Sequence, residues 1–346
     1  MPSYKSKRNT WYCAFYYKDW QGIRKKKKKE GFKTKRESQE WERKFLEKYA
    51  ESPEISFAVL VEEYKKDAQL RLKEQTIYGK SRVITKHILP FFGDMPLNQI
   101  TPRTVNEWKN HILAQKFKPT YIRVIRAQLS SIFNYAKINY NLSSNPCSML
   151  KWRNSPTTID VNYWTLDEFR QFAVHLRKPH HIMSFYLLFW TGMRIGELLA
   201  LTKEDFDFSC NAIHINKTRT RLKGKDIITT PKTKHSNRIV IMPQFLADMV
   251  KDYIRMSKYT SDLLFDYTRN ALQKVLHYYA PRAGIKDIRI HDLRHSHASL
   301  LINAGFPPTE VARRLGHANA SITLSVYSHF YDKTAAKVAE KLNHIT

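Results

Sequence analysis

The segment IHDLRHSHASLLINAG, residues 290–305, combines a helical pattern with polar side chains that packing alone does not require. Its apolar residues recur at helical spacing, and its last residue, Gly305, is typical of a helix end. His291 and Arg294 are three residues apart, so a helix places both side chains on one face. One phosphate group can therefore contact both of them.

Two other segments are similarly rich in polar groups: TGMRIGELLAL at residues 191–201 and LGHANASITLSVYSHF at residues 315–330. Gly316 is a typical stop for a helix over residues 309–315, which places His317 just after a helix end. An arginine, a His-x-x-Arg pair, a Gly-His pair and a tyrosine thus follow one another along the chain.

This ordered set resembles the catalytic signature of the tyrosine recombinase, or phage integrase, family. The resemblance implies a site-specific enzyme that cuts and rejoins DNA through a 3′-phosphotyrosine intermediate, integrating or excising a mobile element. It implies no cofactor, metal or nucleotide. The catalytic residues that it implies are Arg194, His291, Arg294, His317 and Tyr327.

These residue types suit the chemistry of DNA strand transfer. A tyrosyl phosphodiester keeps the energy of the broken bond, so the cut can be reversed. The transition state gains charge on its non-bridging oxygens, and the guanidinium groups of Arg194 and Arg294 present N–H donors that fit phosphate oxygens. The imidazole of His317 is able to donate to the same phosphate or to accept the tyrosine proton. The resemblance favours phosphate binding for His317 and proton transfer for His291.

The leaving 5′-oxygen needs an acid, and the resemblance implies a lysine on a hairpin. Four lysines fall in the segment RLKGKDIITTPKTKHSNRIVIM, and periodicity does not choose among them. The run PKTK at residues 231–234 resembles the family pattern most, so we predict Lys232 as the acid and Lys234 as the second choice. The other two candidates are Lys223 and Lys225.

Several neighbouring residues have plainer interpretations. Glu197 resembles the acidic residue that the family places after its first arginine, and we interpret it as structural support. Tyr331 follows Tyr327 by one helical turn and is the competing nucleophile, but the spacing from His317 favours Tyr327. Ordinary polar helix positions are expected for His295, His297 and His329.

Two rival chemistries share some of these residues. His291 and His295 have the i, i+4 spacing of a zinc protease helix. Asp292, however, stands where that motif has glutamate, and Arg294 would set a cation beside the metal. A DNA-nicking relaxase would place His295 and His297 on a strand, whereas the apolar pattern here continues a helix. Both rival interpretations are disfavoured.

Composition and breaks along the chain predict three domains and an α+β fold class. Residues 1–52 indicate a small antiparallel sheet plus a helix, because aromatic strand-formers precede a helical stripe. Residues 54–150 carry repeated helical stripes and predict an all-α bundle. Residues 160–346 begin with a capping box at Thr165 and predict a mainly α domain with a small antiparallel sheet. Strands are expected there over residues 212–216, 227–230 and 238–242.

The chain is strongly basic. Lys and Arg number 59 against 31 Asp and Glu, a net charge of +28, which favours nucleic acid as the partner. The first 50 residues hold 16 Lys and Arg against 6 acidic residues. The run Lys25–Lys29 is typical of a solvated loop or of a DNA contact, and the aromatic residues near it favour DNA. No stretch predicts a membrane-spanning helix or a signal peptide, so we expect an enzyme of the bacterial cytoplasm, bound to DNA.

The predicted partner is double-stranded DNA at a crossover site. The resemblance further implies flanking arm sites for the first domain, a homotetramer on DNA, and accessory DNA-bending or excision factors. Two alternatives stay open: DNA relaxation in the manner of a type IB topoisomerase, and a non-catalytic DNA-binding protein on the same fold. The basic residues expected on the bundle surface are Lys80, Arg82, Lys86, Arg103, Lys109, Arg123 and Arg126. The cysteines expected to be reduced and without a special role are Cys13, Cys147 and Cys210.

Overall fold

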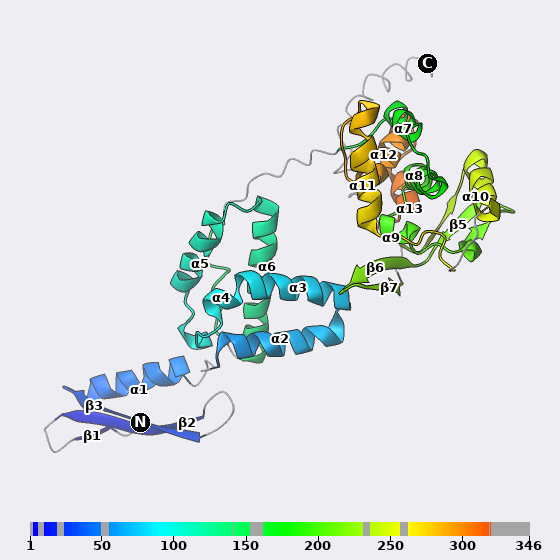
Figure 1. Ribbon diagram of the computed structural model, residues 1–346. Helices are drawn as coiled ribbons and strands as arrows, with labels where there is room; N and C mark the ends of the chain where they lie inside the picture. The colour runs from blue at the N-terminus through cyan, green and yellow to red at the C-terminus, as the bar shows by residue number, and fades with distance from the viewer. Residues whose placement is uncertain are drawn as a thin grey trace, which may run out of the picture. The chain divides into compact units, whose positions relative to one another are not determined.

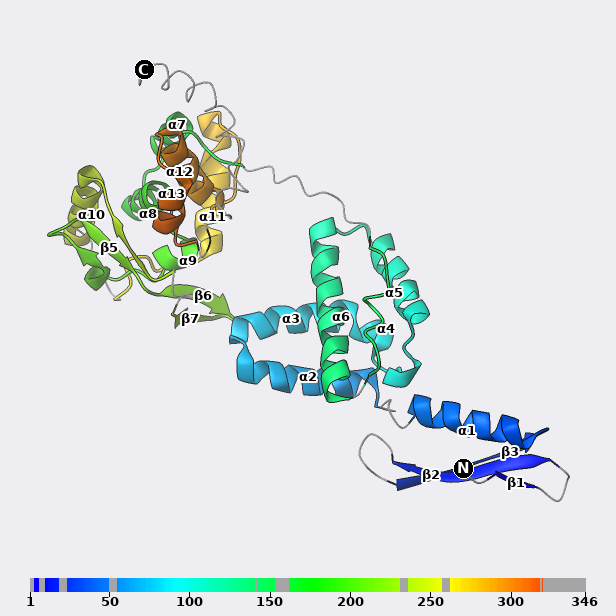
Figure 2. The same ribbon diagram turned by 180° about the vertical axis from the view of Figure 1, so that it is seen from behind.

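The computed structural model of the chain is shown in Figure 1 and, from behind, in Figure 2. Contacts along the chain divide it into two compact units, Met1–Thr157 and Thr158–Thr346. The residues that the structure describes are 3–5, 10–18, 24–49, 55–140, 142–152, 162–230, 236–256, 262–317 and 319.

A three-stranded antiparallel sheet and one helix form the beginning of the chain (Figure 1). In the sheet order, the strands are β1 (Ser3–Lys5), β2 (Trp11–Lys18) and β3 (Arg24–Phe32), and the helix is α1 (Lys35–Tyr49). Cys13 and Phe15 of β2 are buried against Phe45 of α1, and the rings of Phe15 and Phe45 lie 5.4 Å apart. The sheet-plus-helix prediction is confirmed.

The basic run Lys25–Lys29 lies within strand β3 and not in a loop. It pairs in register with the aromatic strand β2, and this pairing overrides the poor strand preference of lysine. Side chains alternate across a strand. Lys27 therefore lies over the ring of Phe45 on the helix side of the sheet, whereas Lys26 lies over the ring of Tyr16 on the other, open face.

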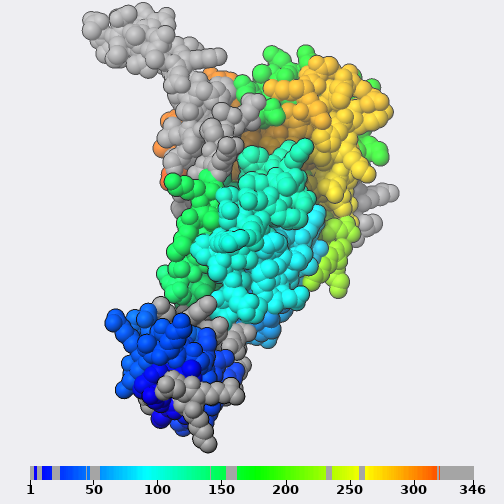
Figure 3. Space-filling model, turned by 90° about the vertical axis from the view of Figure 1, so that its left-hand side faces the viewer, coloured from blue at the N-terminus to red at the C-terminus, as the bar shows by residue number. Residues whose placement is uncertain are grey.

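Helices over residues 57–139 form an all-α bundle, as predicted, and Figure 3 shows part of its surface in cyan. The bounds are α2 (Phe57–Arg71), α3 (Glu74–His87), α4 (Leu89–Phe92), η1 (Leu97–Gln99), α5 (Pro102–Ala114) and α6 (Pro119–Asn139). The side chain of Thr101 caps α5, as expected, and Pro102 occupies its first turn. Trp108 of α5 is fully buried, and its indole N–H donates to His87 O at 2.8 Å.

Some of the basic residues expected on the bundle surface are bonded within the bundle. Lys80 Nζ donates to Gln128 Oε1 at 3.0 Å, and Lys109 Nζ donates to Lys151 O at 3.2 Å. The members of that set that are exposed are Arg82, Lys86, Arg103 and Arg123.

Helices and a small antiparallel sheet build the second unit, as predicted. Its helices are α7 (Leu166–Ala173), α8 (Pro179–Thr191), α9 (Ile195–Leu198), η2 (Lys203–Asp205), α10 (Gln244–Met256), α11 (Arg269–Tyr279), η4 (Pro281–Ala283), α12 (Asp292–Asn303) and α13 (Pro308–Leu315). Its strands are β4 (Phe206–Asp207), β5 (Ala212–Ile215), β6 (Thr218–Leu222), β7 (Lys225–Thr229) and β8 (Arg238–Ile241). Strand β5 pairs with β4 and β8, whereas β6 and β7 form a separate hairpin. Thr165 and Glu168 form the capping box of α7 that the sequence predicts.

The three strands expected in this unit are confirmed, with ends that differ by one or two residues, but β6 is not anticipated by the sequence pattern. Within the described part of the chain, no helix is long and apolar enough to cross a membrane. Cys13 and Cys147 are buried, Cys210 is exposed, and all three are free thiols, as expected.

Candidate active site

Arg194 lies at the N-terminal cap of α9, directly after a left-handed turn that ends α8. Gly192 forms this turn with a φ of 64°, and a Cβ atom there would lie 2.6 Å from the ring of His297 and 2.6 Å from the side chain of Leu315. Glycine is therefore needed both for the backbone angle and for the close approach. Arg194 keeps its side chain 36% exposed, so part of the guanidinium faces outward.

Glu197 is the buried carboxylate that holds Arg194 in place. Its Oε2 accepts from the backbone N–H of Arg194 and its Oε1 accepts from Arg194 Nη1, both at 2.8 Å. Arg238 donates to the same two oxygens at 2.9 and 3.2 Å. Burial alone would raise the pKa of Glu197, but the hydrogen bonds and charges of Arg238 and Arg194 outweigh it and keep this pKa below its usual value. The interpretation of Glu197 as structural support agrees with these contacts.

Arg294 is buried on α12, with an exposed fraction of 4%. Its Nη1 donates to Gly192 O at 2.9 Å, and its Nη2 donates to Leu315 O at 2.7 Å. One side chain thereby joins the end of α8 to the end of α13, and α12 lies beside α8 in both views of the ribbon (Figures 1 and 2). This arginine is fixed by backbone oxygens on two sides before any phosphate arrives.

His291 precedes α12 by one residue, in a helical backbone conformation, and its ring is 5.6 Å from that of His295. The helix predicted for this segment is confirmed over Asp292–Asn303. Partial burial of the ring, and then the nearby His295 and Arg294, lower the pKa of His291 to about 4. His291 is therefore neutral at physiological pH in the free protein.

His317 follows Gly316, which ends α13 in the left-handed conformation that the sequence predicts. Its backbone N–H donates to Ala312 O at 3.0 Å. Burial, and then the charges of Arg294 and Arg194, lower the pKa of His317 to about 4. The same two arginines also act on the pKa of His291. The structure thus brings together four of the six predicted catalytic residues, and it presents two guanidinium groups beside two neutral imidazoles.

The remaining predicted residues lie outside the part of the chain that the structure describes. These are Lys232 and Tyr327, the second choices Lys234 and Tyr331, and His329. The other lysine candidates are described: Lys223 and Lys225 are exposed around the turn between β6 and β7. Over the described residues, no three His, Cys, Asp or Glu side chains gather as a group able to hold a metal ion.

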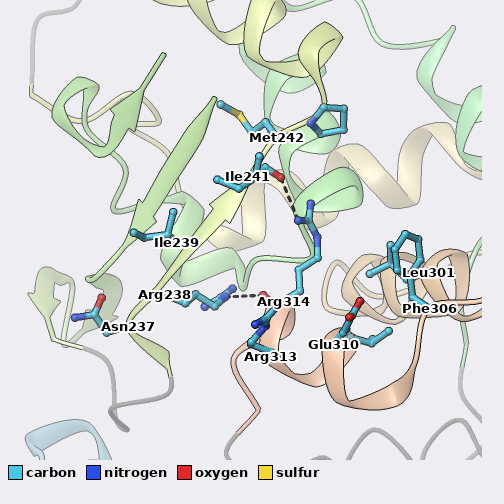
Figure 4. Close-up of a pocket in the computed structure, with 12 residues that line it drawn as sticks. Asn237, Arg238, Ile239, Ile241, Met242, Leu301, Phe306, Glu310, Arg313 and Arg314 are labelled. Carbon is cyan, nitrogen blue, oxygen red and sulfur yellow. Dashed lines mark hydrogen bonds between the residues drawn. The ribbon is translucent and has the colours of Figure 1, made fainter. Parts of the chain in front are cut away.

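Two arginines near the site were missed by sequence reasoning. Arg238 and Arg314 are joined by a 2.9 Å hydrogen bond from Arg238 Nε to Arg314 O, and both line a hollow of about 1040 Å³ beside β8 (Figure 4). A signal for Arg238 exists in the sequence, because it occupies an inward position of β8, two residues before the buried Val240. A basic residue at an inward strand position indicates a buried ion pair.

His297 is buried in the same region, and its titration makes the stability of the second unit depend on pH. Its Nε2 accepts from Arg314 Nε at 3.1 Å, so the ring is neutral. Burial and the charge of Arg314 lower the pKa of His297 to about 3. The unfolded chain has a histidine pKa of about 6.5 and takes up a proton first as the pH falls, so stability present above about pH 6.5 is lost toward about pH 3.

We therefore expect the free energy of unfolding to fall by about 1.4 kcal/mol per pH unit below about pH 6.5 on account of His297. Urea denaturation at two pH values in this range measures the slope. In His297→Gln, which keeps an acceptor for Arg314 but does not titrate, this part of the slope should disappear. An unchanged slope in that variant would show that His297 does not stay neutral in the folded protein.

Comparisons with known proteins place the chain in a family. Residues 165–334 match the model of the Phage integrase family, residues 56–113 match the phage integrase N-terminal SAM-like domain, and residues 2–49 match an Arm DNA-binding domain. The ICEBs1 integrase of Bacillus subtilis is 29% identical over 336 residues, which cover 90% of each chain. The integrase of Mycobacterium phage FRAT1 is 30% identical over 305 residues, which cover 84% of this chain and 90% of that one.

Solved structures share the fold. The Tn1549 transposon integrase in complex with a circular intermediate DNA has a TM-score of 0.69 at 21% identity, covering 83% of this chain and 99% of that chain. A lambda integrase dimer bound to a COC′ core site has a TM-score of 0.59 at 16% identity, covering 96% and 95%. The family models and the integrase relatives, together with this shared fold, define a DNA strand-transfer enzyme. The chain belongs to the phage integrase family and is a site-specific tyrosine recombinase.

Proposed function

We propose that Tyr327 is the nucleophile of this recombinase. Its Oη attacks a backbone phosphorus of double-stranded DNA, a tyrosine–phosphorus bond forms at the 3′ side, and the bond from phosphorus to the 5′-oxygen breaks. Attack by a 5′-hydroxyl of the partner duplex reverses these bonds and releases the tyrosine. The observation that supports this proposal is the convergence of Arg194, Arg294, His291 and His317, which forms a ready site for one phosphate.

Charge explains why this convergence suits a phosphoryl transfer. Two guanidinium groups can stabilise the negative charge that the phosphorus oxygens gain in the transition state. The neutral imidazole of His291 is free of a proton at one nitrogen and can accept the proton of Tyr327, while His317 can donate to a phosphate oxygen. A bound phosphate also raises the pKa of both histidines, because its negative charge favours the protonated ring.

The leaving 5′-oxygen takes its proton from Lys232 in this proposal. We expect Lys232→Ala to lose cleavage of ordinary DNA but to cleave a substrate whose 5′-bridging oxygen is replaced by sulfur, because a thiolate leaves without a proton. Covalent adduct formation with the two substrates measures the rescue. Arg294→Ala is the control and should not be rescued, because its defect lies in transition-state charge. Rescue of Lys234→Ala in place of Lys232→Ala would move the acid by two positions.

The chain is proposed to work as three domains, 1–52, 54–150 and 160–346, with the first reading a DNA site separate from the crossover site. Support comes from the open face of the N-terminal sheet, defined by Arg24, Lys26 and Lys28. Arg24 and Lys26 lie over the ring of Tyr16, and Lys28 lies over the ring of Tyr12. A small sheet of this kind can enter the major groove, where base edges are distinguishable.

Deleting residues 1–50 should leave cleavage of isolated crossover-site substrates intact while eliminating recombination that depends on flanking DNA. The matched test within the full chain compares two double substitutions of equal charge. Lys26→Gln with Lys28→Gln alters the open face and should weaken protection of the flanking site in a footprint. Lys27→Gln with Lys29→Gln alters the helix side, where these residues cover Phe45 and Trp41, and should weaken it much less. Equal loss of protection in both double variants would mean that positive charge alone, and not the open face of the sheet, explains the DNA binding.

Assembly and location complete the proposal. We propose that four copies act together on two duplexes, with accessory DNA-bending or excision factors setting the direction, and that the enzyme works in the bacterial cytoplasm. The relatives named as integrases, one of Bacillus subtilis and one of a Mycobacterium phage, support this setting.

Two other functions fit the same fold. DNA relaxation of the type IB kind would release supercoils without exchanging partners, and a non-catalytic protein would bind DNA without forming an adduct. Nicked duplexes carrying candidate attachment sites from the chromosomal neighbourhood of the gene distinguish them. The proposed function requires a covalent adduct and joined products between two duplexes. An adduct without exchange would favour type IB relaxation, and binding without an adduct would favour a non-catalytic DNA-binding protein.

A further inference from the structure

Arg238 is a buried cation at the start of β8, with its side chain 6% exposed. It is too deeply buried to be a typical DNA contact, and its donors are directed at protein oxygens. Nη1 and Nη2 donate to the carboxylate of Glu197 at 3.2 and 2.9 Å, Nε donates to Arg314 O at 2.9 Å, and Nη1 also donates to Ser236 O at 3.2 Å. Figure 4 shows the guanidinium directed at the end of α13.

The first of these contacts acts on Arg194. The Glu197 carboxylate is shared by the two arginines, and each of its oxygens accepts from both. Arg238 adds a second, bidentate partner whose planar guanidinium holds the plane of the carboxylate. Because Arg194 takes its direction from Glu197, the position of Arg238 sets the direction of the Arg194 guanidinium.

The second contact acts on His317. The last two carbonyl groups of α13 are held by two different arginines: Arg314 O by Arg238 and Leu315 O by Arg294. Gly316 and His317 follow immediately, so these two hydrogen bonds fix the point from which the imidazole extends. A third contact is to Ser236 O, and Ser236 directly follows the sequence 231–235 that contains Lys232.

We propose that Arg238 is a positioning residue for strand transfer. It orients Arg194 through Glu197, and it orients His317 through the end of α13, so that both side chains can contact one phosphate. The proposal rests on the proposed function, because it takes Arg194 and His317 as phosphate ligands. Lysine at this position keeps the charge but has one nitrogen, and it cannot hold the plane of Glu197 and Arg314 O together. A small misplacement of reacting groups lowers the rate of a phosphoryl transfer far more than it lowers binding.

The experiment measures single-turnover adduct formation by full-length Arg238→Lys on nicked attachment-site duplexes, together with DNA affinity. We expect adduct formation to fall on the order of 10²-fold, with DNA affinity nearly unchanged. Arg219→Lys is the matched control, because the side chain of Arg219 is likewise only 9% exposed and likewise donates to carboxylate oxygens, in its case those of Asp226 and Asp266. The control should keep its rate.

A double-mutant cycle tests the route through Glu197. If Arg238 acts through that carboxylate, the rate losses of Arg238→Lys and Glu197→Gln are less than additive, whereas those of Arg219→Lys and Glu197→Gln add. A wild-type rate in Arg238→Lys, or additive losses with Glu197→Gln, overturns the proposal. Should Arg238→Lys lose DNA binding, Arg238→Gln replaces it, and loss of binding in both variants also overturns it. Failure of the unmodified enzyme to form any adduct instead overturns the proposed function.

Discussion

Replacing Tyr327 with phenylalanine should abolish the covalent DNA adduct while DNA binding stays nearly unchanged. The substitution removes one hydroxyl group and no positive charge. Affinity for DNA rests mainly on contacts between basic side chains and phosphates, which this change leaves in place. Adduct formation on a nicked duplex, separated under denaturing conditions, measures the loss, and a mobility shift under native conditions measures the binding.

Tyr331→Phe is the matched control for this prediction, because Tyr331 lies four residues further along the chain and the change is chemically identical. It should form the adduct at nearly the normal rate. Peptide mass mapping of the adduct identifies the attached tyrosine directly. An adduct that persists in Tyr327→Phe, or that maps to Tyr331, would show that Tyr327 is not the nucleophile.

The helical parts of the fold follow from local patterns. The apolar spacing within residues 290–305 predicts α12, and the glycine before His317 predicts the end of α13. These signals work because a helix is specified by residues three and four apart, which a sequence shows directly. The order of Arg194, His-x-x-Arg and Gly-His along the chain then predicts the catalytic site before any geometry is known.

The failures of prediction concern contacts between distant segments. The lysine run in β3 takes its strand conformation from pairing with β2, and the low strand preference of lysine does not predict this pairing. Strand β6, with the sequence TRTRL, lacks an apolar face that would reveal it. Arg294 and Arg238 are buried because they donate to carbonyl groups at the ends of α8 and α13. These helix ends are distant in sequence, so spacing along one helix does not predict the contacts.

Burial distinguishes Arg194 and Arg294, the two arginines proposed to clamp the phosphate, and this leads to the second large expected effect. Arg194→Lys and Arg294→Lys should both lose on the order of 10²- to 10³-fold in adduct formation, because lysine keeps the charge but not the paired N–H donors. Only Arg294→Lys should also lose stability. Its guanidinium satisfies two buried carbonyl groups, at Gly192 and Leu315, and a lysine nitrogen is expected to satisfy one of them at most. An unpaired buried carbonyl costs about 1–3 kcal/mol.

Urea denaturation of the two variants measures this difference, and adduct formation is then compared at a temperature where both are fully folded and bind DNA. Arg194, which is 36% exposed and whose terminal nitrogen bonds only one carboxylate oxygen, should keep nearly all of its stability as lysine, because the lysine can still pair with Glu197. A normal rate in either variant removes that arginine from the clamp. Equal losses of stability would contradict the two-carbonyl anchoring of Arg294, because they would show that its buried contacts contribute no more than the exposed pair at Arg194.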